Sequence, residues 1–143
     1  MKTLADAFEL GRADHGLAVV STLRADGTIQ SSLVNAGVLP HPVSGTESLA
    51  FVTYGPVKLA NLRARPQIVV TFRTGWQWAT VEGNATLLGP QDGDLEPDRL
   101  RILLRDIFAA AGGTHDDWDE YDRVMREQGR TAVLVDPTRI YGS

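Results

Sequence analysis

The chain has 143 residues, a formal net charge of −4 and no cysteine, which together suit one domain with a real hydrophobic core, and we expect that domain to span residues 1–143. The charge argues against nucleic-acid binding, and the lack of cysteine excludes disulfides and thiolate chemistry. No apolar run reaches the ~18 residues of a membrane span, and the N-terminus lacks a signal peptide's apolar stretch. We therefore expect a cytoplasmic protein with no membrane partner.

The N-terminal part predicts one helix followed by three strands. Thr3 with Asp6 three residues later is a helix-start signature, and this helix should run to about Asp14. Asp26-Gly27 is typical of a hairpin turn between the first two strands. The β-rich segments that predict the strands are residues 17–23, 28–39 and 48–54.

A short helix after the third strand places a lysine where an anion could bind. Pro56 suits the first helical position and Pro66 ends the helix, so Lys58 lies in its first turn. Helix N-termini offer unpaired N–H groups and a partial positive charge, to which Lys58 adds a full charge. The segment 48–81 contains four basic residues and no acid. This pattern suggests a local site for a small anion, and the alternatives are a solvated lysine and a chance clustering of bases.

The segment from Phe72 to Leu88 predicts the strand around which the chain is organised. After a turn at Thr74-Gly75, small apolar residues alternate with polar ones, as in a strand with one buried face. Trp76 and Trp78 fall on the polar face, although a soluble domain rarely leaves two tryptophans in water. Two interpretations stay open. Either a helix or a second subunit covers this face, or a planar ligand lies on it.

The C-terminal part predicts two helices and a last strand. Apolar residues recur at helical spacing up to Gly112-Gly113, and Thr114 with Asp117 predicts the start of the next helix. Residues 131–135 predict the final strand, with a short extension at 137–141. Consecutive strands joined by short turns predict a mainly β fold with flanking helices (α+β), in which an antiparallel barrel carries the helices outside.

No catalytic group stands out in the sequence. His15, His41 and His115 are separated and lack the spacing of metal ligands, so no metal site is expected. The chain has no dinucleotide-binding glycine fingerprint after a strand, no Walker loop and no nucleophile elbow. An enzyme built on this chain would depend on a cofactor, and the protein would supply binding and orientation.

Four stretches carry a resemblance to a known family. They are LAVVSTLRADGTIQSS, KLANLRARPQIVVTF, GWQWATVEGNATL and HDDWDEYDRVMREQGRTAVLVDPTRIYG. In this order and spacing the chain resembles the split-barrel family of pyridoxamine 5′-phosphate oxidase-like, flavin- and deazaflavin-dependent proteins, and above all its F420-dependent branch. The resemblance implies a six-stranded antiparallel split β-barrel of the FMN-binding type. It also implies a homodimer with two cofactor sites at the interface.

The resemblance also implies roles for individual residues. Lys58 falls on the family's phosphate-binding lysine and Asn61 on the asparagine of the same motif. Thr53 falls where a hydroxyl is often near the phosphate, and Ser32 near where family members contact the ring. The two remaining matches are aromatic residues that approach the cofactor across the dimer, Trp76 and Trp78.

The chain departs from the family pattern at two places. Pro56 and Val57 stand where relatives often carry a second basic residue, and Leu33 stands where an asparagine is often found. Part of the phosphate or ring contact must then come from elsewhere, and Arg63 or Arg73 could supply it.

The sequence therefore predicts a homodimeric oxidoreductase that uses coenzyme F420. It would transfer a hydride between the deazaflavin and an unsaturated or carbonyl-conjugated small organic substrate, with no residue assigned as catalytic. FMN is the alternative cofactor. A non-catalytic carrier or binding protein for a flavin or deazaflavin, and a purely structural dimer, stay open as well.

Overall fold

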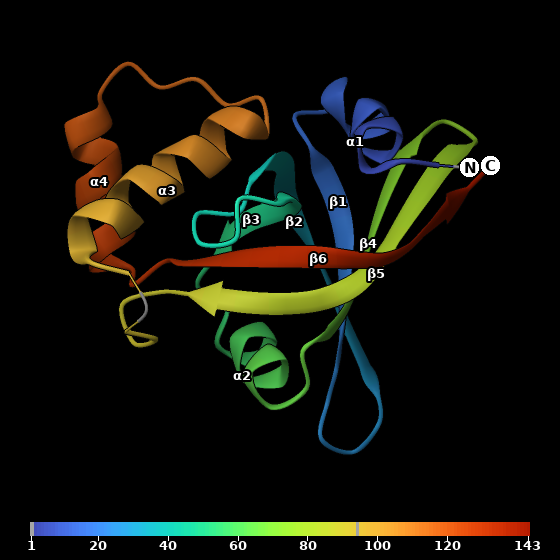
Figure 1. The fold of residues 1–143 in the computed structure, drawn as a ribbon, viewed down its shortest axis with the longest axis horizontal. Coiled ribbons are helices and arrows are strands. Elements are labelled where there is room, and N and C mark those ends of the chain that lie inside the picture. The colour runs from blue at the N-terminus through green and yellow to red at the C-terminus, as the bar shows by residue number, and fades with distance from the viewer. Residues whose placement is uncertain (1, 94) are drawn as a thin grey trace.

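The computed structural model describes residues 2–93 and 95–143, which form a six-stranded antiparallel barrel with helices outside it (Figure 1). In chain order the elements are α1 (Leu4–Arg12), β1 (Leu17–Leu23), β2 (Ile29–Pro40), β3 (Glu47–Thr53), α2 (Pro56–Ala64), β4 (Gln67–Thr74), β5 (Gln77–Leu88), α3 (Pro97–Ala110), α4 (Trp118–Glu127) and β6 (Thr131–Gly142). Around the barrel the strand order is β1-β2-β3-β6-β5-β4, and β4 pairs with β1 to close it. The expected fold class is confirmed.

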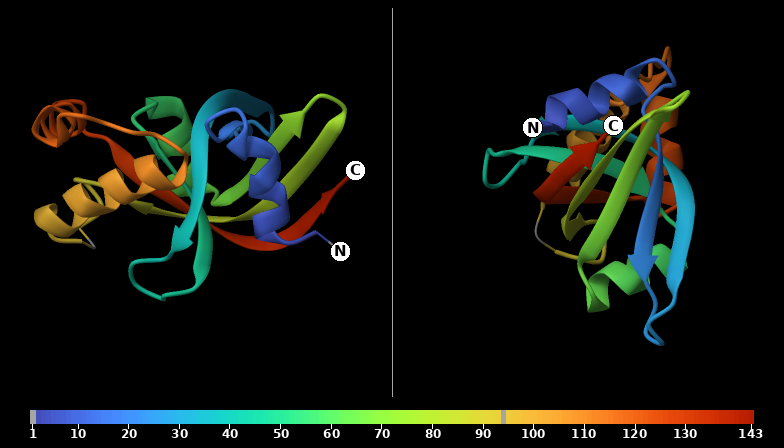
Figure 2. Two further views of the ribbon diagram at one scale, coloured as in Figure 1. Left: turned by 90° about the horizontal axis from the view of Figure 1, so that it is seen from above. Right: turned by 90° about the vertical axis from the view of Figure 1, so that its right-hand side faces the viewer.

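Helices α1 and α2 lie at opposite ends of the barrel (Figures 1 and 2). The predicted start of α1 is confirmed, because Thr3 Oγ1 accepts from the Asp6 N–H at 3.1 Å and Asp6 Oδ2 accepts from the Thr3 N–H at 2.9 Å. The buried face of α1 carries Phe8, whose ring meets the edge of Phe72 at 6.2 Å between centroids. This aromatic pair packs α1 onto the apolar core of the barrel.

Side chains that alternate along the strands build two hydrophobic cores. One core fills the barrel interior, where Phe51 and Phe72 are fully buried. The second lies outside the barrel, where α3 packs on β2, β3 and β6 and α4 packs beside α3. Strand β3 contributes to both, because Leu49 and Phe51 face the interior while Ala50 faces the helices. The helical layer is thus fixed to the barrel by an apolar contact of its own.

The last strand is longer than the sequence predicts. β6 runs without interruption from Thr131 to Gly142, whereas the sequence predicts a strand over 131–135 and only a short extension at 137–141. Proline cannot donate to the ladder and is tolerated in a sheet at a bulge. Pro137 stands opposite Gly83, where the β5–β6 register shifts between Glu82 and Gly83. The bulge therefore accommodates the proline and lets the strand continue.

The start of α4 also differs from the expectation. Thr114 does not cap the helix. Asp117 is the N-cap residue, and its Oδ1 accepts from the Glu120 N–H at 3.1 Å. An aspartate is as strong a cap as a threonine, and the one that directly precedes the helical turn takes the role. The segment from Gly112 to Asp116 is left as a loop between the two helices.

None of the helices in the described part of the chain is both long enough and apolar enough to cross a bilayer.

Gly37 lets α3 approach the barrel closely. A Cβ at this position of β2 would lie 2.5 Å from the backbone carbon of Ala110 and from the backbone nitrogen of Ala111. Backbone atoms at the end of a helix cannot turn aside as a flexible side chain can. Any other residue at position 37 must therefore push the end of α3 away from the strand.

We predict that Gly37→Ala lowers the free energy of unfolding by about 1–3 kcal/mol, the usual cost of overpacking. Elsewhere in a strand the same change stabilises, since glycine is the costlier residue there by about 0.5–1 kcal/mol. Urea unfolding of the variant measures the difference. Ile102→Ala on the exposed face of α3 is the control and should cost less. A Gly37→Ala protein as stable as the parent would contradict the close approach.

Candidate functional site

Lys58 lies at the α2 end of the barrel and points inward. Gly55 is the N-cap of α2 and Pro56 its first residue, so Lys58 is in the first turn, as predicted. Its side chain is only 7% exposed. Lys58 Nζ donates to Thr53 Oγ1 at 3.4 Å and lies 5.9 Å from the centroid of the Phe51 ring. The alternative of a solvated lysine is therefore wrong.

The charge of Lys58 has no protein counter-charge near it. Among the described residues no carboxylate lies within ion-pair distance of Nζ. Burial lowers the pKa of Lys58 from its ordinary value, because desolvation disfavours the charged form. A buried cation with one long hydrogen bond is costly, and an anion that reached Nζ would offset that cost.

Other polar side chains from three elements face the same interior. Asn61 on α2 is buried and donates from Nδ2 to Thr22 Oγ1 at 3.1 Å, and Thr22 in turn donates to Gln30 Oε1 at 3.2 Å. Ser32 is the next inward residue of β2 after Gln30. Its Oγ is buried and has no hydrogen-bond partner in the described part of the chain. The barrel end thus contains unused hydrogen-bonding capacity as well as an unpaired cation.

Two members of this cluster, Thr22 and Gln30, were not singled out by the sequence analysis. The strand at 28–39 contained a signal, because Gln30 and Ser32 lie on the same side as Val34, which is buried. Polar residues on the buried face of a strand need partners, so they point to a polar interior at that end of the barrel.

Only one of the two tryptophans lies where the strand pattern placed it. Trp76 lies in the turn between β4 and β5 and is 97% exposed, so the expectation that it shares a strand face with Trp78 is wrong. The register pairs Thr74 with Gln77, which makes Gly75 and Trp76 a two-residue hairpin loop. Trp78 does face outward on β5, where its ring meets the edge of the Tyr141 ring at 6.1 Å.

Within one chain the tryptophans and Lys58 are far apart. The β4–β5 hairpin turn lies at the α1 end of the barrel, and α2 lies at the other end (Figure 1). The structure therefore brings together Lys58, Thr53 and Asn61 but not the two tryptophans. Only a second subunit could place Trp76 or Trp78 beside the lysine.

The two arginines proposed to complete the phosphate site have other partners. Arg63 pairs with Asp92 through Nε–Oδ1 at 3.3 Å, on the exposed side of α2. Arg73 donates to the carbonyl oxygen of Gly75 at 2.9 Å in the hairpin turn. Arg63 would have to give up this ion pair to reach a ligand at Lys58. Arg73 lies at the opposite, α1 end of the barrel (Figure 1), too far from Lys58 in the same chain to contribute.

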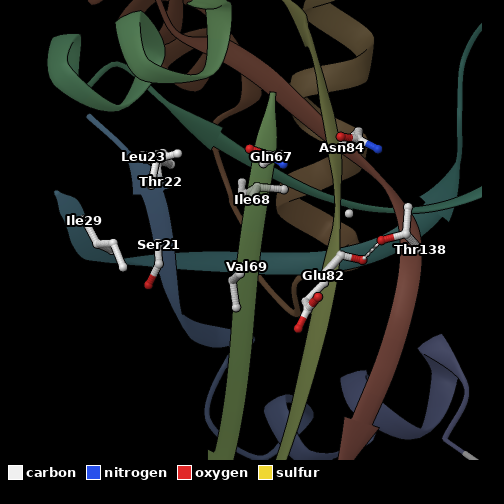
Figure 3. A pocket seen from close by; sticks show the side chains of 11 residues that line it. Ser21, Thr22, Leu23, Ile29, Gln67, Ile68, Val69, Glu82, Asn84 and Thr138 are labelled. Carbon is white, nitrogen blue, oxygen red and sulfur yellow. Dashed lines mark hydrogen bonds between the residues drawn. The ribbon is translucent and has the colours of Figure 1, made fainter. Parts of the chain in front are cut away.

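A second feature is a shallow hollow of about 370 Å³ on the outside of β1, β4, β5 and β6. Ser21, Val69 and Glu82 lie on three neighbouring strands and point to the same side (Figure 3). Glu82 Oε2 accepts from the Tyr141 hydroxyl at 2.5 Å, and this hydrogen bond raises the pKa of Tyr141. Next to the hollow, β1 and β2 expose Val19 and Leu33. We call the outward side chains of β1, β2, β4 and β5 the outer sheet face.

Solved structures of similar fold support the architecture. A conserved hypothetical protein from Mycobacterium tuberculosis superposes with a TM-score of 0.70 at 16% identity, over 99% of this chain and 84% of that one. An F420 reductase gives 0.59 at 18%, over 87% and 88% of the two chains. A pyridoxamine 5′-phosphate oxidase-related, FMN binding protein from Nostoc punctiforme gives 0.63 at 15%, over 97% and 81%. At these identities the likeness shows the fold alone.

A family model described as pyridoxamine 5′-phosphate oxidase matches residues 4–143, which is nearly the whole chain. The match spans the barrel strands, Lys58 and the outer sheet face. This protein therefore belongs to the pyridoxamine 5′-phosphate oxidase family of split β-barrels.

Proposed function

We propose that this protein is an oxidoreductase that binds coenzyme F420 through its phosphate at Lys58. The observation that carries the proposal is the buried lysine without a counter-charge in the first turn of α2. Fold similarity to an F420 reductase agrees with it. FMN, which also carries a phosphate, is the alternative, since an FMN binding protein has the same fold.

The groups around Lys58 fit a phosphate. The first backbone bond of α2 runs from the Leu59 N–H to the Gly55 carbonyl at 3.1 Å. The N–H groups of Val57 and Lys58 precede this bond and point toward the helix start, where an anion is stabilised. The Thr53 hydroxyl lies beside Lys58 Nζ. Charge, helix dipole and a hydroxyl thus converge at one end of the barrel.

The protein's own residues would bind and orient, and the coenzyme would supply the hydride chemistry when bound. Lys58 and the start of α2 would hold the phosphate. Asn61 would hold α2 against β1 through its hydrogen bond to Thr22. The outer sheet face of one subunit, covered by its partner, would exclude water from the reacting centre. The substrate would be a small unsaturated or carbonyl-conjugated compound. No described side chain has been assigned as a proton donor, so solvent would protonate the product.

Lys58→Ala should weaken binding of coenzyme F420 at least tenfold, because a hydrogen bond to a charged group contributes about 1.5–3 kcal/mol. Titration calorimetry with F420, and with FMN in parallel, measures the effect and ranks the two cofactors. Arg126→Ala removes an equal charge from the exposed side of α4 and is the matched control. Unchanged affinity in Lys58→Ala would remove this lysine from the proposed site.

Lys58→Met should stabilise the ligand-free protein while it abolishes phosphate binding. The methionine fills a similar volume without a desolvated charge, and we expect a gain of roughly 1–3 kcal/mol at neutral pH. Because burial lowers the pKa of Lys58, the destabilisation of the parent is greatest at pH below the folded-state pKa and lessens as pH rises through it. Urea unfolding at pH 7 and at higher pH measures both effects. A less stable Lys58→Met protein would show that the charge is compensated.

We further propose that two copies associate through the outer sheet face, which exposes Leu33 at 66% and Val19 at 45%. This is the arrangement that would bring a partner's tryptophan to Lys58. Leu33→Asp should give monomers in sedimentation velocity, since a buried carboxylate without a partner is costly at an interface. Val43→Asp, equally exposed but on the β2–β3 loop, should leave the dimer intact. A parent protein that sediments as a monomer would contradict the arrangement.

A further inference from the structure

A second cavity, of about 680 Å³, lies outside the barrel between β3 and the helical layer of α3 and α4. We propose that it binds a small organic carboxylate with a planar apolar body. Its volume is within the range of about 300–1,000 Å³ that ligand pockets occupy. The proposal does not depend on the cofactor, because the residues around Lys58 do not line this cavity.

The walls of the cavity are mainly apolar and aromatic. Tyr121 is one of the lining residues and is held in place, because its hydroxyl donates to the Leu104 carbonyl at 2.8 Å. Burial raises the pKa of Tyr121 to about 12, so this side chain stays neutral. Flat rings and aliphatic side chains favour a planar hydrophobic ligand body. The apolar and aromatic residues of the walls are Val52, Ile107, Phe108, Ala111, Tyr121, Val124 and Met125.

Arg130 supplies a positive charge to this cavity. Its guanidinium stacks on Tyr54 with the Cζ atom 4.0 Å from the ring centroid, and its Nε donates to Gln128 Oε1 at 2.8 Å. In the described part of the chain it makes no ion pair with a carboxylate. The stacking fixes the plane of the guanidinium, and a fixed planar fork of N–H groups matches the geometry of a carboxylate.

His115 supplies a second donor. Its Nδ1 accepts from the Asp117 N–H at 3.0 Å, so the proton of the neutral imidazole must sit on Nε2. The ring packs against Phe108 and Trp118 at 6.2 Å and 5.8 Å between centroids, which limits its orientation. His115 is thus held by its Nδ1 side and presents an N–H on the other.

The loop at the opposite rim is held in an uncommon backbone conformation. His15 has φ of 56°, a left-handed geometry that residues other than glycine adopt rarely. Asn35 donates from Nδ2 to the His15 carbonyl at 2.9 Å, and both residues line the cavity. Local strain of this kind persists where surrounding contacts enforce it, and it occurs often at ligand sites.

The one carboxylate among the described lining residues does not neutralise the positive charge of Arg130. Glu120 is exposed at the cavity, and its carboxylate pairs with Arg123 at 3.7 Å. The other titratable lining groups are His15, His115, Tyr121 and Arg130. A site with one stacked cation, whose one carboxylate among the described lining residues is already paired with an arginine, favours an anion with a single charge over an ammonium compound or a phosphate dianion.

Benzoate is the probe that tests the proposal, with benzamide as its neutral counterpart and inorganic phosphate as the alternative anion. We expect benzoate to shift the amide NMR signals of residues 112–115 and 124–125 saturably in the full-length protein. Benzamide should bind at least tenfold more weakly, and phosphate should leave these signals unchanged. Arg130→Gln should reduce benzoate affinity to that of benzamide, whereas Arg130→Lys should retain part of it.

Two further variants locate the binding. Met125→Trp should block the cavity and abolish benzoate binding without removing a charge. Lys58→Ala should leave benzoate binding unchanged, which separates this site from the proposed cofactor site. The proposal is overturned if benzoate causes no saturable shift, or if benzamide binds as well as benzoate. Loss of benzoate binding in Lys58→Ala would also overturn it. So would unchanged benzoate binding in both Met125→Trp and Arg130→Gln. Binding of benzoate by a protein that binds neither F420 nor FMN would leave this site standing and remove the proposed function.

Discussion

The organisation of this protein depends on β3 being covered on both faces. Strand side chains alternate, so Phe51 and Thr53 enter the barrel while Val52 lies against the helical layer. Lys58 contacts the inward pair, and the second cavity begins at the outward residue. The residues of the two proposed sites are therefore one residue apart on the same strand. In a sheet with only one face covered, one face of the strand would be exposed to water, and the strand could contribute to only one of the two sites.

Those features of the fold that rest on local signals were predictable from the sequence. The Thr3–Asp6 capping box and the alternating faces of β5 are encoded within a few residues, and both are confirmed. The predictions were wrong where the structure depends on pairing between segments that are distant in the sequence. Whether Trp76 belongs to a strand depends on which residues of β4 and β5 pair. Pro137 can stay in β6 because the pairing with β5 shifts there, leaving Thr138 as an extra residue between Pro137 and Arg139. The hydrophobic pattern of one segment shows neither the β4–β5 pairing nor the bulge in β6.

The candidate site divides in the same way. Helix-start signals were enough to put Lys58 in the first turn of α2. They could not show that its side chain turns inward, because that depends on β1 and β4 closing the barrel around it. The second cavity had no sequence signal at all. His15, Val52, His115 and Arg130 come from four separate segments, and each looked unremarkable alone.

Net charge is a poor guide to the ligands of this protein. Several of the acidic residues that give the chain its charge of −4 are engaged in helix caps and ion pairs: Asp117 caps α4, Asp122 pairs with Arg105, and Asp92 with Arg63. The hydrogen bond from Arg105 holds the pKa of Asp122 below its usual value, so this pair stays charged. Lys58 and Arg130 have no such partner among the described residues. Exposed acids and bases interact weakly through water, whereas a cation removed from water retains most of its need for an anion. An acidic protein can therefore carry two local sites for anions, and the position of each unpaired cation indicates where its ligand would bind.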